Sequence, residues 1–148
     1  MSIFRLGAAF IASSAITYTL ASAFYTQQVL AKQAAIGAVY TAGQQAATYF
    51  DNFLGLAPAY GAVLTAALLI GFVVAAFVKR VLKPLAPVAY PVAGAAAVFT
   101  AIWSIENLVA GGGVGAMGGA RDGLGVALQC LAGGIGGSVF AVTRGGAR

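Results

Sequence analysis

The sequence is poor in charge and in the side chains that most often bind metals. Charged residues make up only 7% of its 148 residues, and it contains no histidine and a single cysteine, Cys130. A soluble domain carries about a quarter charged residues, so this chain has too few polar side chains to cover a surface in water. A lipid bilayer removes that need, because the outside of a membrane protein can be as apolar as its interior.

These shortages exclude several kinds of chemistry. Without histidine the chain cannot build a histidine-ligated haem or most zinc sites, and a single cysteine forms no intramolecular disulfide. A Ser-His or Cys-His nucleophile pair is excluded for the same reason. The lysines lie at the predicted ends of apolar segments, not beside a buried serine. We therefore expect no metal, no cofactor and no enzymatic activity, and the scattered basic residues predict no nucleic-acid partner.

Apolar residues, by contrast, make up 61% of the chain. A membrane-spanning helix needs about 20 predominantly apolar residues. Four segments meet this requirement, and we predict a single domain built as an all-α bundle of four transmembrane helices. The predicted helices cover residues 4–25, 60–78, 88–108 and 123–142, each end being approximate.

The first of these segments has an alternative interpretation. Arg5 precedes it, and Ala21-Ser22-Ala23 resembles a signal-peptide cleavage site. Several serine, threonine and tyrosine residues interrupt the segment, and it continues to Phe24, which favours a helix that is retained. Both interpretations place the residues that follow outside the cytoplasm.

Lysine and arginine residues near the helix ends predict the orientation, because they are enriched in cytoplasmic loops. If the N-terminus is inside, two basic residues, Lys32 and Arg121, lie outside. Six lie inside: Arg5, Lys79, Arg80, Lys83, Arg144 and Arg148. The bias predicts that both termini are cytoplasmic. Lys79, Arg80 and Lys83 are also candidates for binding anionic lipid headgroups, although a plain topology signal explains them as well.

The outer segment between the first two helices, about residues 34–56, has an amphipathic pattern. Its apolar residues recur at helical spacings: Ile36, Tyr40, Ala47, Phe50 and Leu54. We expect an amphipathic helix that lies at the membrane interface and ends before Pro58. Tyr40, Tyr49 and Tyr60 are expected at the level of the lipid headgroups, where their hydroxyls stay wet.

Small residues in the fourth predicted helix indicate close helix packing. Gly125, Gly133 and Gly137 recur on one side of it, and glycine is disfavoured in a helix unless another backbone approaches closely. Gln129 lies on the same side and is the most polar residue deep in the predicted membrane. We expect it to form a hydrogen bond between helices, with contact to a polar substrate or ion as the alternative.

Three charged residues flank the outer connection between the third and fourth helices. Glu106 lies near the C-terminal end of a helix, where the helix dipole disfavours a negative charge, so we expect an ion pair with Arg121. Asp122 is expected to cap the N-terminus of the fourth helix. The alternative is that Glu106 and Arg121 form a polar site or proton relay.

Three short stretches resemble a known group of proteins. They are Gly55 to Tyr60, Gly119 to Arg121, and Ala127 to Ala141 with its repeated glycines. In these stretches the chain resembles small uncharacterised four-helix membrane proteins of proteobacteria. The resemblance implies a multi-pass protein of the bacterial inner membrane and carries no assigned activity.

The function that these features favour is a non-enzymatic integral membrane protein, an accessory or interaction component of the inner membrane. Its expected partners are the lipid bilayer and either a second copy of the chain or another membrane protein. The alternative is a small oligomeric channel or transporter with a polar path near Gln129 or near Glu106 and Arg121. A dry, glycine-packed interior would favour the first function, and a polar cavity would favour the second.

Overall fold

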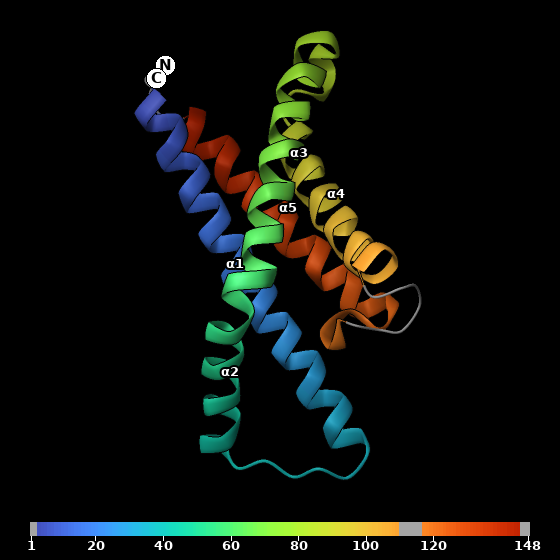
Figure 1. The fold of residues 1–148 in the computed structure, drawn as a ribbon. Coiled ribbons are helices and arrows are strands. Elements are labelled where there is room, and N and C mark those ends of the chain that lie inside the picture. The colour runs from blue at the N-terminus through green and yellow to red at the C-terminus, as the bar shows by residue number, and fades with distance from the viewer. Residues whose placement is uncertain (1–2, 110–116, 146–148) are drawn as a thin grey trace.

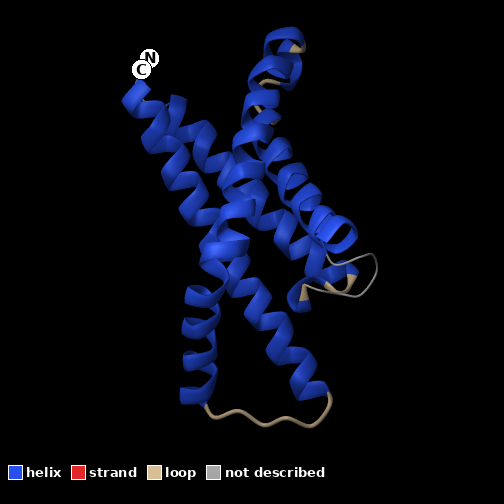
Figure 2. Cartoon of the chain, viewed as in Figure 1, coloured by secondary structure: helices blue, strands red, loops and turns tan. Residues whose placement is uncertain are grey.

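The computed structural model describes residues 3–109 and 117–145, and every regular element in these ranges is helical. Figures 1 and 2 show long helices joined by short connections, with both ends of the chain at the same end of the molecule. The elements in chain order are α1 (Ile3–Ala35), α2 (Ala42–Leu56), the π-helical turn η1 (Ala57–Gly61), α3 (Ala62–Val81), the 3-10 turn η2 (Lys83–Leu85), α4 (Ala89–Ser104), the π-helical turn η3 (Ile105–Val109), the 3-10 turn η4 (Gly118–Ala120) and α5 (Gly123–Gly145).

Within the described residues, four helical stretches are long and apolar enough to cross a membrane. They are Ile3–Ala35, Ala42–Val81, Ala89–Leu108 and Gly123–Arg144. The prediction of an all-helical protein with four such helices is thereby confirmed.

Helix α1 extends ten residues beyond the predicted end. Between Tyr25 and Ala35 the sequence holds no glycine or proline, and its alanine, glutamine, leucine and lysine residues favour helix. The helix ends at Gly37, whose φ of 94° lies in the left-handed region that favours glycine. The amide of Gly37 donates to the Ala34 carbonyl and that of Ala38 to the Gln33 carbonyl, both at 3.0 Å. This pair of hydrogen bonds is the Schellman motif that closes a helix C-terminus.

The predicted break at Pro58 is wrong, because the helical conformation continues from Ala42 to Val81. A proline inside an α-helix has no amide hydrogen to donate and clashes with a carbonyl of the preceding turn. Here the chain widens locally into η1, with Pro58 among its first residues, and α3 follows directly. At the other end, Thr41 and Gln44 form a capping box that starts α2.

Helix α5 packs against α4 on one side and against α1 on another. A side chain at Gly133 would overlap the carbonyl group of Gly94 in α4, and one at Gly137 would overlap that of Tyr90. Toward α1, Ser13 Oγ donates a 2.7 Å hydrogen bond to the Gly136 carbonyl. The glycines of α5 therefore let two neighbouring backbones approach closely, as van der Waals association in lipid requires.

Gly125 has a different environment from the other two glycines of the predicted packing face. A side chain there would overlap the carbonyl oxygen of Gly119 in η4, not a spanning helix. Gly125 thus allows η4 to fold back over the start of α5.

Adjacent glycines in α5 provide a matched test of this packing. Gly133→Ala is expected to lower the free energy of unfolding by about 1–3 kcal/mol, because the new methyl group would meet the backbone of Gly94. Gly134→Ala is expected to be neutral or stabilising. Its added carbon would lie 3.7 Å from the nearest atom, and alanine favours helix. Thermal unfolding of both variants in the same detergent is the measurement, and equal stabilities would contradict the close α4–α5 contact.

Candidate functional site

Gln129 lies at the centre of the bundle and joins three parts of the chain. Its side chain is completely buried. The Tyr60 hydroxyl donates to Gln129 Oε1 at 2.9 Å, and Gln129 Nε2 donates to the Ala21 carbonyl at 3.0 Å. The amide therefore links α5 to α1 and to η1, and both ends of it have partners. A buried amide bonded in this way stabilises helix association and presents no free polar group to a substrate.

The sequence position of Tyr60 suggested a hydroxyl that stays wet, whereas the side chain is buried. Only 3% of its surface is exposed, and its ring belongs to the apolar core around Leu64 and Val98. The η1 turn that accommodates Pro58 also contains Tyr60, at the junction of α2 and α3. Nothing in the sequence pattern distinguishes this tyrosine from Tyr40 and Tyr49, which are only partly buried, because its burial depends on the continuity of α2 and α3.

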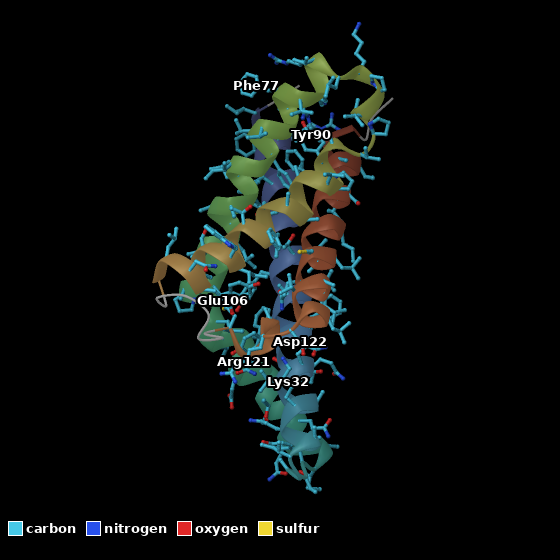
Figure 3. All side chains as sticks on the ribbon, turned by 90° about the vertical axis from the view of Figure 1, so that its right-hand side faces the viewer. Lys32, Phe77, Tyr90, Glu106, Arg121 and Asp122 are labelled. Atoms are coloured by element: carbon cyan, nitrogen blue, oxygen red, sulfur yellow. The ribbon has the colours of Figure 1, made fainter. Side chains whose placement is uncertain are left out.

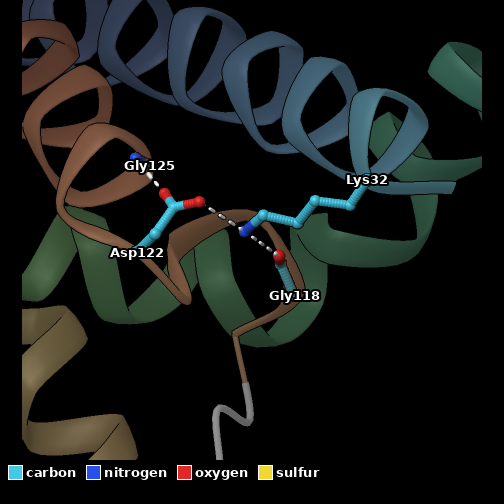
Figure 4. Close-up of polar contacts among 4 residues, drawn as sticks. All are labelled: Lys32, Gly118, Asp122 and Gly125. Atoms are coloured by element: carbon cyan, nitrogen blue, oxygen red, sulfur yellow. Dashed lines mark hydrogen bonds and ion pairs between the residues drawn. The ribbon is translucent and has the colours of Figure 1, made fainter. Parts of the chain in front are cut away.

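Asp122 holds the start of α5 and contacts α1 at the same time (Figure 4). One carboxylate oxygen accepts a 2.7 Å hydrogen bond from the amide of Gly125, as expected of a helix cap. The other lies 3.1 Å from Lys32 Nζ, which also donates to the Gly118 carbonyl at 3.5 Å. The Gly125 amide and the Lys32 ammonium lower the pKa of the Asp122 carboxyl.

The ion pair between Lys32 and Asp122 was not predicted from the sequence. The sequence places Lys32 only among the basic residues outside the membrane, because the first predicted helix ends near residue 25. The extra turns of α1 carry Lys32 to the level of η4 (Figure 3). Both side chains are partly exposed, so the pair contributes little to stability and serves mainly to position η4 against α1.

The expected ion pair between Glu106 and Arg121 stays a prediction. Glu106 lies in the η3 turn, and its Oε1 atom is buried with no hydrogen-bond partner in the part of the chain that the structure describes. Arg121 lies between η4 and Asp122. The cation for the carboxylate next to Arg121 in the sequence, Asp122, comes from Lys32 of α1.

Of the three predicted headgroup-binding residues, Lys79 differs from the other two. Arg80 and Lys83 are exposed, but Lys79 is half-buried, with its Nζ atom 5.2 Å from the centre of the Tyr90 ring. Arg144, at the end of α5, lies over the same ring at 5.2 Å. The sequence does not show that these residues lie together, because they come from three different helices.

The described residues hold no group of three or more acidic, histidine or cysteine side chains placed to bind a metal ion. Cys130 is a free, partly buried thiol next to Gln129 in the sequence. Around Gln129, the tyrosine hydroxyl, the amide and the Ala21 carbonyl satisfy one another, whereas the buried Thr17 hydroxyl on the same face of α1 has no hydrogen-bond partner among the described residues.

A double-mutant cycle tests the bond between Tyr60 and Gln129. Tyr60→Phe and Gln129→Leu should each lower the free energy of unfolding, by about 1 kcal/mol for the shared hydrogen bond. The double variant should cost less than the sum of the two, because neither partner is then left unpaired. Ser138→Ala is the control, since that hydroxyl bonds only the Gly134 carbonyl of its own helix. Strict additivity in detergent unfolding would contradict the link.

Comparison of the chain with family models, curated proteins and solved structures gave no match. The resemblance to small proteobacterial membrane proteins therefore stays a prediction, and the function has to be argued from the geometry of this chain.

Proposed function

We propose that the chain is a non-enzymatic, multi-pass protein of the bacterial inner membrane that acts by binding another membrane protein. The observation that carries this proposal is the closed centre of the bundle, where Gln129 is fully buried and bonded at both ends of its amide. A transport path would need polar groups that face water. The backbones of Gly94 and Gly133 are in direct contact, which leaves no room for a transport path between α4 and α5 at this level.

The part of the molecule available to a partner is the α1–α2 hairpin, defined as residues 26–56. Figure 1 shows it extending beyond the start of α5, away from the two chain ends. With its 33 residues, α1 is about 50 Å long, whereas the hydrocarbon core of a bilayer is about 30 Å thick. The hairpin therefore extends beyond the hydrocarbon if the rest of α1 spans it.

Polar side chains hold the two helices of the hairpin together. The Tyr49 hydroxyl donates to Gln27 Oε1 at 2.5 Å, and Asn52 Nδ2 donates to Thr26 Oγ1 at 3.2 Å. Phe53 of α2 packs against the Tyr18 ring of α1, whereas Phe50 and Leu54 are 63% and 55% exposed and form an apolar strip on the outside of α2. An outward apolar strip on a helix needs cover, and a helix of another membrane protein would provide it. Insertion of the same strip into the lipid interface, as the amphipathic pattern suggested, is the alternative.

For the orientation we propose that both chain ends are cytoplasmic and that the hairpin is outside. The imbalance of six basic residues against two supports this. The fold is consistent with it, because the α3–α4 connection lies at the end of the molecule that carries both chain ends (Figure 1).

Cysteine labelling tests the orientation. In a Cys130→Ser background, Val39→Cys should react with a membrane-impermeant thiol reagent in intact cells. Val81→Cys should react only after permeabilisation. Both side chains are highly exposed, at 93% and 79%, so access to the reagent depends on the membrane alone. Labelling of position 81 in intact cells would contradict the proposed orientation.

Site-specific photocrosslinking tests the partner. A benzophenone side chain at position 50 should form a reproducible adduct with one membrane protein or with a second copy of the chain. At position 77, an equally exposed phenylalanine on α3, it should react with lipid. Leu54→Gln should abolish the protein adduct while leaving thermal stability within about 0.5 kcal/mol, as for other exposed positions. Adducts with lipid alone at position 50 would support the interfacial alternative and contradict a protein partner.

A further inference from the structure

Two cations share one aromatic ring at the end of the bundle that carries the chain ends. Lys79 at the end of α3 and Arg144 at the end of α5 each lie 5.2 Å from the centre of the Tyr90 ring in α4. A cation over an aromatic face is attracted to it, but two cations beside one ring also repel each other. Neither forms an ion pair within the part of the chain that the structure describes.

The chain has no acidic side chain at this end to relieve the repulsion. Its three acidic residues are Asp51, Glu106 and Asp122. Asp51 lies on α2, at the opposite end of the molecule, and the other two lie well away from Tyr90 toward that end (Figures 1 and 3). An anion that relieves the repulsion between Lys79 and Arg144 therefore has to come from outside the described chain.

Tyr90 adds a second unsatisfied group. The residue is 3% exposed, and its hydroxyl has no hydrogen-bond partner among the described residues. A buried hydroxyl without a partner costs free energy, which an acceptor oxygen would recover. The flexible side chains of Lys79 and Arg144 lie over the Tyr90 ring and can rearrange around an incoming group.

The surroundings of this ring have the shape and polarity of an amphiphile site. A groove of about 290 Å³ is lined by both cations, Tyr90 and the Pro87 turn. An adjoining groove of about 180 Å³ shares Tyr90 and Arg144 with it, and its other walls are entirely apolar. Those walls are Leu6, Phe10, Leu69, Phe72, Val73, Ala76 and Phe140.

We propose that Lys79, Tyr90 and Arg144 bind one anionic phospholipid. Its phosphate lies between the two cations and accepts a hydrogen bond from the Tyr90 hydroxyl, and one acyl chain enters the apolar groove beside Phe10 and Phe72. The charge of the site complements a phosphate, and the polarity of the adjoining groove complements a hydrocarbon chain. This site is distinct from the α1–α2 hairpin and does not depend on the proposed partner.

Native mass spectrometry of the full chain with defined lipids tests the site. Wild type should retain one dioleoyl phosphatidylglycerol in preference to dioleoyl phosphatidylcholine. Lys79→Gln and Arg144→Gln should each weaken phosphatidylglycerol binding about fivefold, the effect of one basic residue at an anionic surface. Arg80 was also a headgroup candidate but does not line the groove. Arg80→Gln is therefore the matched comparison: it removes the same charge from the adjacent exposed residue and should weaken binding clearly less than Lys79→Gln.

Two further variants keep the test independent of folding. Tyr90→Phe keeps the aromatic ring and removes only the unpartnered hydroxyl, so it should weaken binding without lowering the melting temperature. Ala76→Leu narrows the apolar groove and should weaken lipid binding. Inorganic phosphate, the other source of the same anion, should not displace the lipid.

Three results would overturn the proposal. Equal retention of the two lipids by wild type would show that the site does not select an anion. An effect of Arg80→Gln as large as that of Lys79→Gln would show attraction by the whole basic surface. Displacement of the lipid by inorganic phosphate, with Ala76→Leu binding normally, would show a site for a free anion.

Discussion

The arrangement of this bundle depends on the contact between the backbones of α4 and α5. Lipid removes the hydrophobic gain of bringing two apolar helices together, so close van der Waals contact has to provide the association. Gly94 and Gly133 provide it by placing main-chain atoms of the two helices against each other. Gly136, on another side of α5, permits the approach of α1 and accepts the hydrogen bond from Ser13. One helix with glycine on two sides thus fixes the positions of its two neighbours.

Close contact alone does not determine how far one helix is shifted along its neighbour. Hydrogen bonds determine this register. The Gln129 amide can meet both the Tyr60 hydroxyl and the Ala21 carbonyl in only one relative position of α1, η1 and α5. Farther along α1, Lys32 meets Asp122 where that carboxylate caps α5. The polar residues of the described bundle are therefore used mainly to position helices, which explains how a chain with so little charge can still specify one arrangement.

Composition predicted the number and type of the spanning helices, because that signal depends only on length and hydropathy. Glycine inside a spanning helix usually marks a place where a second backbone approaches closely, so the spacing of Gly133 and Gly137 predicted their packing role. The sequence alone does not show which side chains meet across helices. Lys32 reaches Asp122 only because α1 continues past residue 25. Tyr60 is buried only because the π-helical turn η1 accommodates Pro58 and lets the helix continue. Serine and threonine in the first segment interrupt an apolar run in the sequence, whereas Ser13 and Thr17 are completely buried and face α5.

The π-helical turn at η1 has a mechanical consequence. Helix α1 is uninterrupted over its whole length, so it resists bending, whereas the second side of the hairpin contains a widened turn with a proline, the kind of site at which helices bend. Displacement of the hairpin would therefore concentrate in residues 57–61. Tyr60 is one of these residues, and its hydroxyl is bonded to the centre of α5. The hairpin cannot pivot at this hinge without straining or breaking the bond to Gln129, so displacement of the hairpin is mechanically coupled to the middle of the bundle.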